Sequence, residues 1–163
     1  MLETLPVVEI RRARPEDALA VQRVYVAAVK DVSNDHYSHE ELDAWSQNMD
    51  PSTFAARLDD HDMFVAVADD VVVGFGDFYP TTGLMAAIYV DPAFAGRHVG
   101  TELLMRAEHA ARARGIAELY LDASLNAVPF YVARGYSIGA TARHRLRTGT
   151  EITCVTMKKS LVD

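Results

Sequence analysis

Apolar residues in the first third of the chain follow the spacing of a short strand and then of amphipathic helices. The pattern predicts a strand over residues 7–12. Pro15 and the acids after it favour a helix start, and apolar residues then recur on one helix face at Val21, Val24, Tyr25, Ala28 and Val29. Ser38 and Glu41 have the spacing of a capping box and predict a second helix. A third begins at Pro51 and runs to about Leu58.

The rest of the chain alternates between strand and helix patterns. Three apolar runs at 63–68, 71–79 and 84–90 are separated by short polar turns, which predicts an antiparallel meander. The spacing then predicts a helix over 100–114, a strand over 119–122, a helix over 127–134, and strands at about 136–147 and 151–158. We therefore expect an α/β fold, a mixed sheet with helices on both faces.

Composition places the chain among ordinary globular domains. Of its 163 residues 50% are apolar and 24% charged, and this length favours a single domain over 1–163. Cys154 is the only cysteine, which fits a reducing compartment. No apolar run approaches the roughly 20 residues of a membrane span, and the first four residues lack the basic stretch of a secretory signal. We expect a cytoplasmic protein without a membrane partner.

Charge is negative overall and unevenly distributed. The formal net charge of −7 argues against nucleic acid as a partner. Within residues 31–62 one basic side chain, Arg57, accompanies nine acidic ones: Asp31, Asp35, Glu40, Glu41, Asp43, Asp50, Asp59, Asp60 and Asp62. Such a segment either attracts a cationic ligand or forms a solvated surface.

Residues 88–104 read as a buried strand, a glycine-containing turn and the start of a helix. Backbone N–H groups at such a turn, together with the positive end of the helix dipole, form a site for phosphate oxygens. The alternative is that Gly96 and Gly100 only shape a tight turn.

This stretch resembles the acetyl-coenzyme A pyrophosphate site of the GNAT superfamily of N-acetyltransferases, whose signature is Gln or Arg, two residues, Gly, one residue, and Gly or Ala. Ala95 takes the first place, His98 the first Gly and Gly100 the last, so two of three positions depart. The departure at His98 either places an imidazole beside the phosphates or disturbs the loop.

A second block, residues 121–136, resembles the downstream motif of the same superfamily, Asn-x-x-Ala-x-x-x-Tyr-x-x-x-Gly-Phe. Ala127, Tyr131 and Gly135 fall in register, whereas Ser124 stands at the usual Asn place with Asn126 two residues on. The resemblance implies that Ser124 or Asn126 bonds the pantetheine arm. It also implies that Tyr131 donates a proton to the departing thiolate.

The resemblance covers the whole order of elements and implies a GNAT fold, with a largely antiparallel sheet splayed between strands 84–90 and 119–122. Acetyl-coenzyme A is the implied co-substrate, with no metal. The implied cofactor-binding residues are Ile88, Tyr89, Val90, Gly96, Arg97, His98, Val99, Gly100, Thr101, Ser124, Asn126, Ala127, Phe130 and Tyr131.

The acceptor side is less defined. Strand 84–90 has no carboxylate to act as general base, so the candidates are Asp77, His36, His39, Glu40, Glu41 and a water chain to solvent. By resemblance, His36 and His39 belong to a lid over the acceptor site, and Trp45 either lines the acceptor pocket or anchors its helix.

We expect acetyl transfer to a primary amine, specifically a small cationic metabolite or drug. Two alternatives stay open: a protein N-terminus or lysine as acceptor, and a coenzyme A-binding sensor without turnover. The sequence leaves open whether the chain forms a homodimer.

Overall fold

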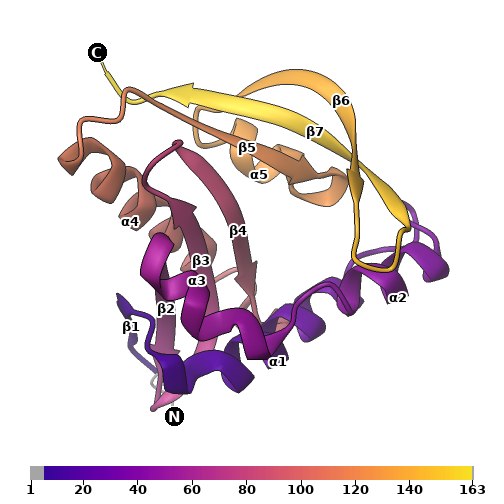
Figure 1. The fold of residues 1–163 in the computed structure, drawn as a ribbon, viewed down its shortest axis with the longest axis horizontal. Coiled ribbons are helices and arrows are strands. Elements are labelled where there is room, and N and C mark those ends of the chain that lie inside the picture. The colour runs from indigo at the N-terminus through magenta and orange to yellow at the C-terminus, as the bar shows by residue number, and fades with distance from the viewer. Residues whose placement is uncertain (1–5, 163) are drawn as a thin grey trace, which may run out of the picture.

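The computed structural model describes residues 6–162, which form one seven-stranded sheet flanked by helices (Figure 1). The strands are β1 (Val8–Arg12), β2 (Asp62–Ala68), β3 (Val71–Tyr79), β4 (Leu84–Val90), β5 (Glu118–Ser124), β6 (Ser137–Arg145) and β7 (Glu151–Ser160). The helices are α1 (Ala18–Lys30), α2 (His39–Ser46), α3 (Phe54–Asp60), α4 (Val99–Ala113) and α5 (Val128–Val132). Every predicted element is present. The first four residues, which lack the basic stretch of a secretory signal, lie outside this range.

Helices cover both faces of the first half of the sheet, because alternate residues of a strand point to opposite faces. Val65 and Phe75 belong to the core under α1 and α2, whereas Phe64 on the same strand as Val65 packs with Val99 of α4. Helix α4 approaches β3 closely at Gly74, where an added Cβ would lie 3.1 Å from Val99 Cγ1. The prediction of a mixed sheet with helices on both faces is confirmed.

The sheet opens between β4 and β5. Its strand order is β1-β2-β3-β4-β5-β7-β6, and all neighbours are antiparallel except β4 and β5. Those two parallel strands share one register pair, Leu84 with Tyr120, and then diverge (Figure 1). Among the described residues, the edge of β4 beyond Leu84 that faces β5 has no strand partner. The predicted splay is therefore confirmed.

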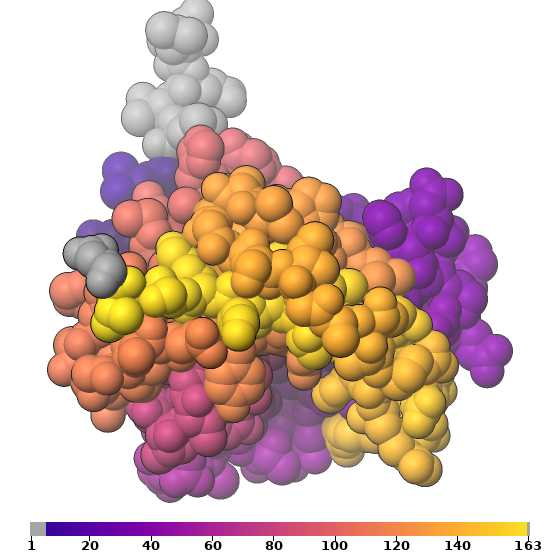
Figure 2. Space-filling view, turned by 90° about the horizontal axis from the view of Figure 1, so that it is seen from above, coloured from indigo at the N-terminus to yellow at the C-terminus, as the bar shows by residue number. Residues whose placement is uncertain are grey.

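The end of the β6–β7 hairpin folds back onto the segment that carries α2. The Tyr37 hydroxyl donates to the Thr153 carbonyl at 2.6 Å and accepts from the Leu125 N–H at 2.9 Å. Arg147 N–H donates to Asn48 Oδ1 at 2.7 Å. Figure 2 shows β7 and β6 as the outer layer, with the α2 segment beside them. These bonds tie the two halves of the chain together across the opening.

Candidate active site

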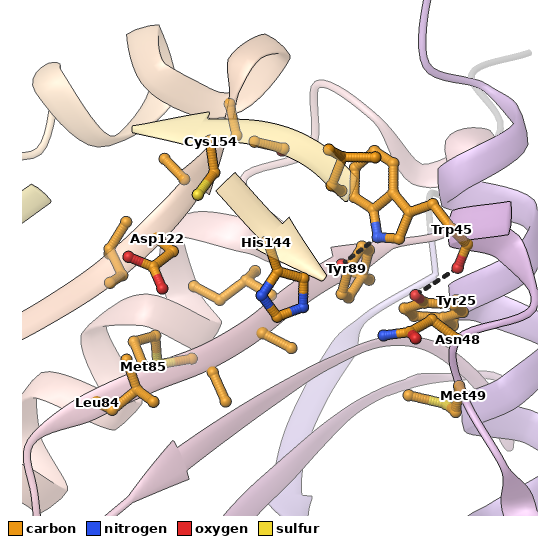
Figure 3. Close-up of a pocket in the computed structure, with 18 of the residues that line it drawn as sticks. Tyr25, Trp45, Asn48, Met49, Leu84, Met85, Tyr89, Asp122, His144 and Cys154 are labelled. Carbon is orange, nitrogen blue, oxygen red and sulfur yellow. Dashed lines mark hydrogen bonds between the residues drawn. The ribbon is translucent and has the colours of Figure 1, made fainter. Parts of the chain in front are cut away.

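A cavity of about 340 Å³ lies at the opening between β4 and β5 (Figure 3). That volume is within the range of small-molecule sites in proteins. Side chains from α1, the α2–α3 segment, β4, β5, α5 and the β6–β7 hairpin line it, so both halves of the fold build one site.

Three aromatic side chains form one wall of this cavity, called the larger cavity below because a second one of about 210 Å³ adjoins it. The Tyr25 hydroxyl donates to the Trp45 carbonyl at 2.7 Å, and Trp45 Nε1 donates to the Tyr89 hydroxyl at 3.3 Å. Burial raises the pKa of Tyr89 to about 12, so this hydroxyl stays protonated at neutral pH. Because the Tyr25 and Trp45 donors are used within the cluster, the wall is largely apolar. Trp45 thus lines the cavity, as an acceptor-side residue would.

Tyr131 enters the larger cavity from α5. Its side chain is 7% exposed and packs edge-on against Phe130 and Tyr136. The Tyr131 hydroxyl makes no hydrogen bond to residues 6–162 and lines the cavity, where it is available to a ligand. Burial raises its pKa far above the ordinary tyrosine value. The hydroxyl therefore stays protonated at neutral pH.

The expectation that Asp77 is a general base does not fit its surroundings. Its side chain is fully buried on β3 and lies behind the cavity wall. One carboxylate oxygen accepts from Arg57 Nη2 at 2.6 Å, and the other lies 2.6 Å from His61 Nδ1. With both oxygens bonded and the side chain outside the cavity lining, Asp77 instead fixes the position of Arg57, which does line it.

Asp77→Asn is expected to lower the free energy of unfolding by about 3 kcal/mol. Removing the carboxylate charge leaves the positive charge of Arg57 without its partner. An amide also turns an N–H₂ group toward either Arg57 or His61. Urea denaturation followed by circular dichroism measures the change. Asp59→Asn, on the exposed side of α3, is the matched control. A loss below about 1 kcal/mol would show that the pair contributes little.

The structure does not bring His36 and His39 to the cavity, although the sequence suggests them as acceptor-side residues. Both are exposed, and His39 contacts Asn34 instead. Neither lines either cavity. Glu40 and Glu41 are likewise outside the larger cavity, so the histidines and these two acids are not placed to take a proton from an acceptor bound there.

The nine acidic residues of segment 31–62 also lie outside the larger cavity. Most are on the surface, whereas Asp62 is buried and bonded to Arg12 and Arg114. The exposed acidic residues of this segment therefore fit the alternative of a solvated surface. None of the nine therefore contacts an acceptor bound in that cavity.

The turn before α4 has the geometry of an anion site. His98 is the residue before the helix and adopts a left-handed conformation with φ of 62°. That conformation favours glycine, which explains why a glycine suits this position. The first N–H groups of α4 have no partners within the helix. Gly96, Arg97 and His98 are exposed, so the turn is open to a ligand.

Arg134 lies beside this turn and was missed by the sequence analysis. Its Nε and Nη2 donate to Thr101 Oγ1 at 2.8 and 2.5 Å, and Nη1 donates to the Phe130 carbonyl at 2.8 Å. The guanidinium also stacks 3.9 Å from the Phe130 ring centre. A fixed cation therefore stands next to the start of α4. In the sequence, the feature that could have pointed to Arg134 is its place within the second motif, directly before Gly135.

A second cavity of about 210 Å³ shares walls with the first. Tyr89, Ser124, Ala127, Ile88 and Trp45 line both, while Val90, Ala95 and Asn126 line only the second. The unpaired edge of β4 runs along both cavities toward the turn before α4. A long, thin molecule with a phosphate end fits this course, because backbone groups of β4 bind it as an added strand and the helix start binds the phosphates.

Several cavity residues carry no sequence signal of their own. Asn48, Asp122, His144 and Cys154 line the larger cavity together with Arg57. Burial raises the pKa of the Cys154 thiol, which disfavours a nucleophilic thiolate. Sequence motifs miss these residues because they come from four separate segments that only the tertiary fold brings together.

No three His, Cys, Asp or Glu side chains within residues 6–162 gather as they would around a metal ion. None of the helices in that range has the length and apolarity needed to cross a bilayer.

Known proteins resemble the chain over most of its length. A family model described as an acetyltransferase (GNAT) domain matches residues 33–161. The chain is 28% identical over 129 residues to the uncharacterised N-acetyltransferase YafP of Escherichia coli K12, which covers 79% of this chain and 81% of YafP. A GCN5-related N-acetyltransferase structure from Rhodopseudomonas palustris is 34% identical with a TM-score of 0.87, covering 98% of each chain.

A more distant structure, the PaiA N-acetyltransferase of Thermoplasma acidophilum in complex with coenzyme A, is 20% identical with a TM-score of 0.78. It covers 94% of this chain and 99% of that one. Family match, fold and splayed sheet agree with the two motifs of the sequence. The chain therefore belongs to the GNAT family of acetyl-coenzyme A-dependent N-acetyltransferases.

Proposed function

We propose that the protein transfers the acetyl group of acetyl-coenzyme A to a small primary amine bound in the larger cavity. The observation that carries the proposal is the Tyr131 hydroxyl, which is neutral, unpartnered among the described residues and at the cavity surface beside the splay. A cavity of about 340 Å³ supports a small acceptor over a protein chain.

Each residue has a part in this proposal. The β4 edge at Ile88, Tyr89 and Val90 aligns the pantetheine arm, with Ser124 and Asn126 opposite. The pyrophosphate is held by the turn and the start of α4, at Gly96, Arg97, His98, Val99, Gly100 and Thr101. Ala127 and Phe130 shape the walls.

The transfer step needs one proton donor, Tyr131, and water to take up the proton of the amine. The amine nitrogen bonds to the acetyl carbon while the carbon–sulfur bond breaks, and Tyr131 donates its proton to the departing sulfur. The proton lost by the amine passes through the open cavity to water, from which Tyr131 is protonated again. An alkylamine has a pKa of roughly 10.4, so only its minor neutral form reacts at pH 7.

We expect kcat/KM to rise with pH, by up to about tenfold per unit below the pKa of the amine. Tyr131 adds no falling limb below about pH 10, because burial raises its pKa and the donor stays protonated there. Initial rates from pH 6 to 10 measure the profile. A plateau starting near pH 7 would contradict loss of the proton to water and point to a base such as His144.

Free thiol release from acetyl-coenzyme A with a panel of amines tests the function itself. Amine-dependent release supports transfer. A rise in melting temperature with acetyl-coenzyme A, but no release with any amine, would instead support a coenzyme A-binding sensor. Release only with peptides, and not with small amines, would favour a protein N-terminus or lysine as acceptor.

A further inference from the structure

We propose that the acceptor amine also carries a carboxylate group, and that Arg57 binds this carboxylate in the larger cavity. The inference names the substrate class and rests on the acetyl transfer proposed above. It replaces the cationic acceptor that the charge of segment 31–62 suggested.

Arg57 is fixed in place before any ligand binds. Its Nη2 donates to Asp77 Oδ2 at 2.6 Å, and Asp77 is held from the other side by His61. His61 is itself buried and packs against Tyr79, with ring centres 3.7 Å apart. A guanidinium held in this way loses little side-chain freedom when it binds an anion, which improves affinity.

Most hydrogen-bond donors of Arg57 remain available. A guanidinium has five N–H groups, and among residues 6–162 the Arg57 side chain makes one hydrogen bond, to Asp77. Its side chain is 30% exposed and lines the cavity, whereas Asp77 and His61 lie behind it. The planar fork of N–H groups matches the two oxygens of a carboxylate.

Two further polar side chains line the same cavity. Asn48 accepts from the Arg147 N–H through Oδ1, which leaves its Nδ2 group as a donor. His144 on β6 turns its ring into the cavity, and the Asn48 amide faces the same space (Figure 3). Neither carries negative charge, so both tolerate an anion nearby.

The one carboxylate in the cavity wall, Asp122, is set apart from this group. It lies near Leu84, Met85 and Cys154, whereas Tyr25 and Asn48 occupy the other end of the view in Figure 3. Arg57 reaches the cavity from α3, and its charge partly offsets the rise in the pKa of Tyr25 that burial and Tyr89 cause. The cavity thus offers a cation and two neutral polar groups to an acceptor.

Matched pairs of acceptors test the proposal by turnover. Amino acids are compared with the amines that lack only the carboxylate, for example phenylalanine with phenethylamine and 4-aminobutyrate with propylamine. We expect kcat/KM at least tenfold higher for the acid of one or more pairs. Arg57→Gln is expected to lower that value by about 10- to 100-fold while changing the plain amine less than threefold. Preference for plain amines throughout, or an equal loss for both members, would overturn it.

Variants separate binding from folding. Arg57→Lys keeps a charge beside Asp77 but lacks the fork, and we expect an intermediate loss. Arg106→Gln removes an exposed charge of α4 outside the cavity and should change neither member of a pair. Aminophosphonates form a third arm, since their preferred use over amino acids would overturn the choice of a carboxylate.

A second readout does not depend on turnover. Trp45 is the only tryptophan and lines the cavity, so its fluorescence reports binding there. We expect 3-phenylpropionate to bind at least tenfold more tightly than its amide, with the difference lost in Arg57→Gln. If no amine is acetylated but this difference is present, the proposed function fails and the Arg57 site stands. Equal binding of acid and amide would overturn the site, whatever the enzyme acetylates.

Discussion

Gly100→Glu is expected to abolish the thermal stabilisation that acetyl-coenzyme A gives the native protein. A ligand present at 100 times its Kd stabilises the fold by about 2.7 kcal/mol, which for this size is a rise of about 5–10 °C in Tm. A Cβ at residue 100 would already lie 3.4 Å from the Phe130 ring. The longer side chain therefore crowds the start of α4 and brings a negative charge to the proposed phosphate site.

The fold itself should tolerate this change, because a carboxylate in the first turn interacts favourably with the helix dipole. Met105→Glu is the matched control: it adds the same charge to the same helix at a side chain that is 62% exposed. Thermal melts with and without millimolar acetyl-coenzyme A measure both variants. A full ligand-induced shift in Gly100→Glu would place the pyrophosphate elsewhere.

Tyr131→Phe is expected to lower kcat by about 10²- to 10⁴-fold, the usual contribution of a general acid. The KM for acetyl-coenzyme A should change little, since the ring and its packing against Phe130 and Tyr136 are kept. Steady-state kinetics at saturating amine separate the two constants.

Tyr136→Phe is the matched control for this loss. Tyr136 belongs to the same core cluster, but it does not line the cavity, and its buried hydroxyl has no partner within residues 6–162. Removing that oxygen costs no hydrogen bond and should leave kcat unchanged. An unaltered kcat in Tyr131→Phe would make Tyr131 a packing residue.

The elements of the fold were predictable because each has a local signal. Apolar spacing marks α1, and the capping box at Ser38 and Glu41 forms as the sequence suggests. The splay followed from the family resemblance and not from the spacing, since nothing in residues 84–90 alone says which strand fails to pair. Tyr131 and Ser124 were found through a motif, and the structure places both at the cavity.

The acceptor side was not predictable, because its chemistry depends on packing between distant segments. Asp77 reads as a free acid in sequence, yet α3 brings Arg57 and His61 onto its two oxygens. The charge of a segment likewise does not say which face it occupies. In α2 the apolar Leu42 and Trp45 turn inward and leave Asp43 on the surface.

The gap between β4 and β5 reflects a compromise between stability and function. Pairing the full length of β4 would add ladder hydrogen bonds, so leaving it open gives up stability that the sequence otherwise favours. An unpaired edge on the outside of a sheet invites aggregation with another chain. Here the bare edge lies inside the sheet, opposite β5, and lines the two cavities. The fold thus keeps a strand edge free for a ligand without placing it at the outer border of the sheet.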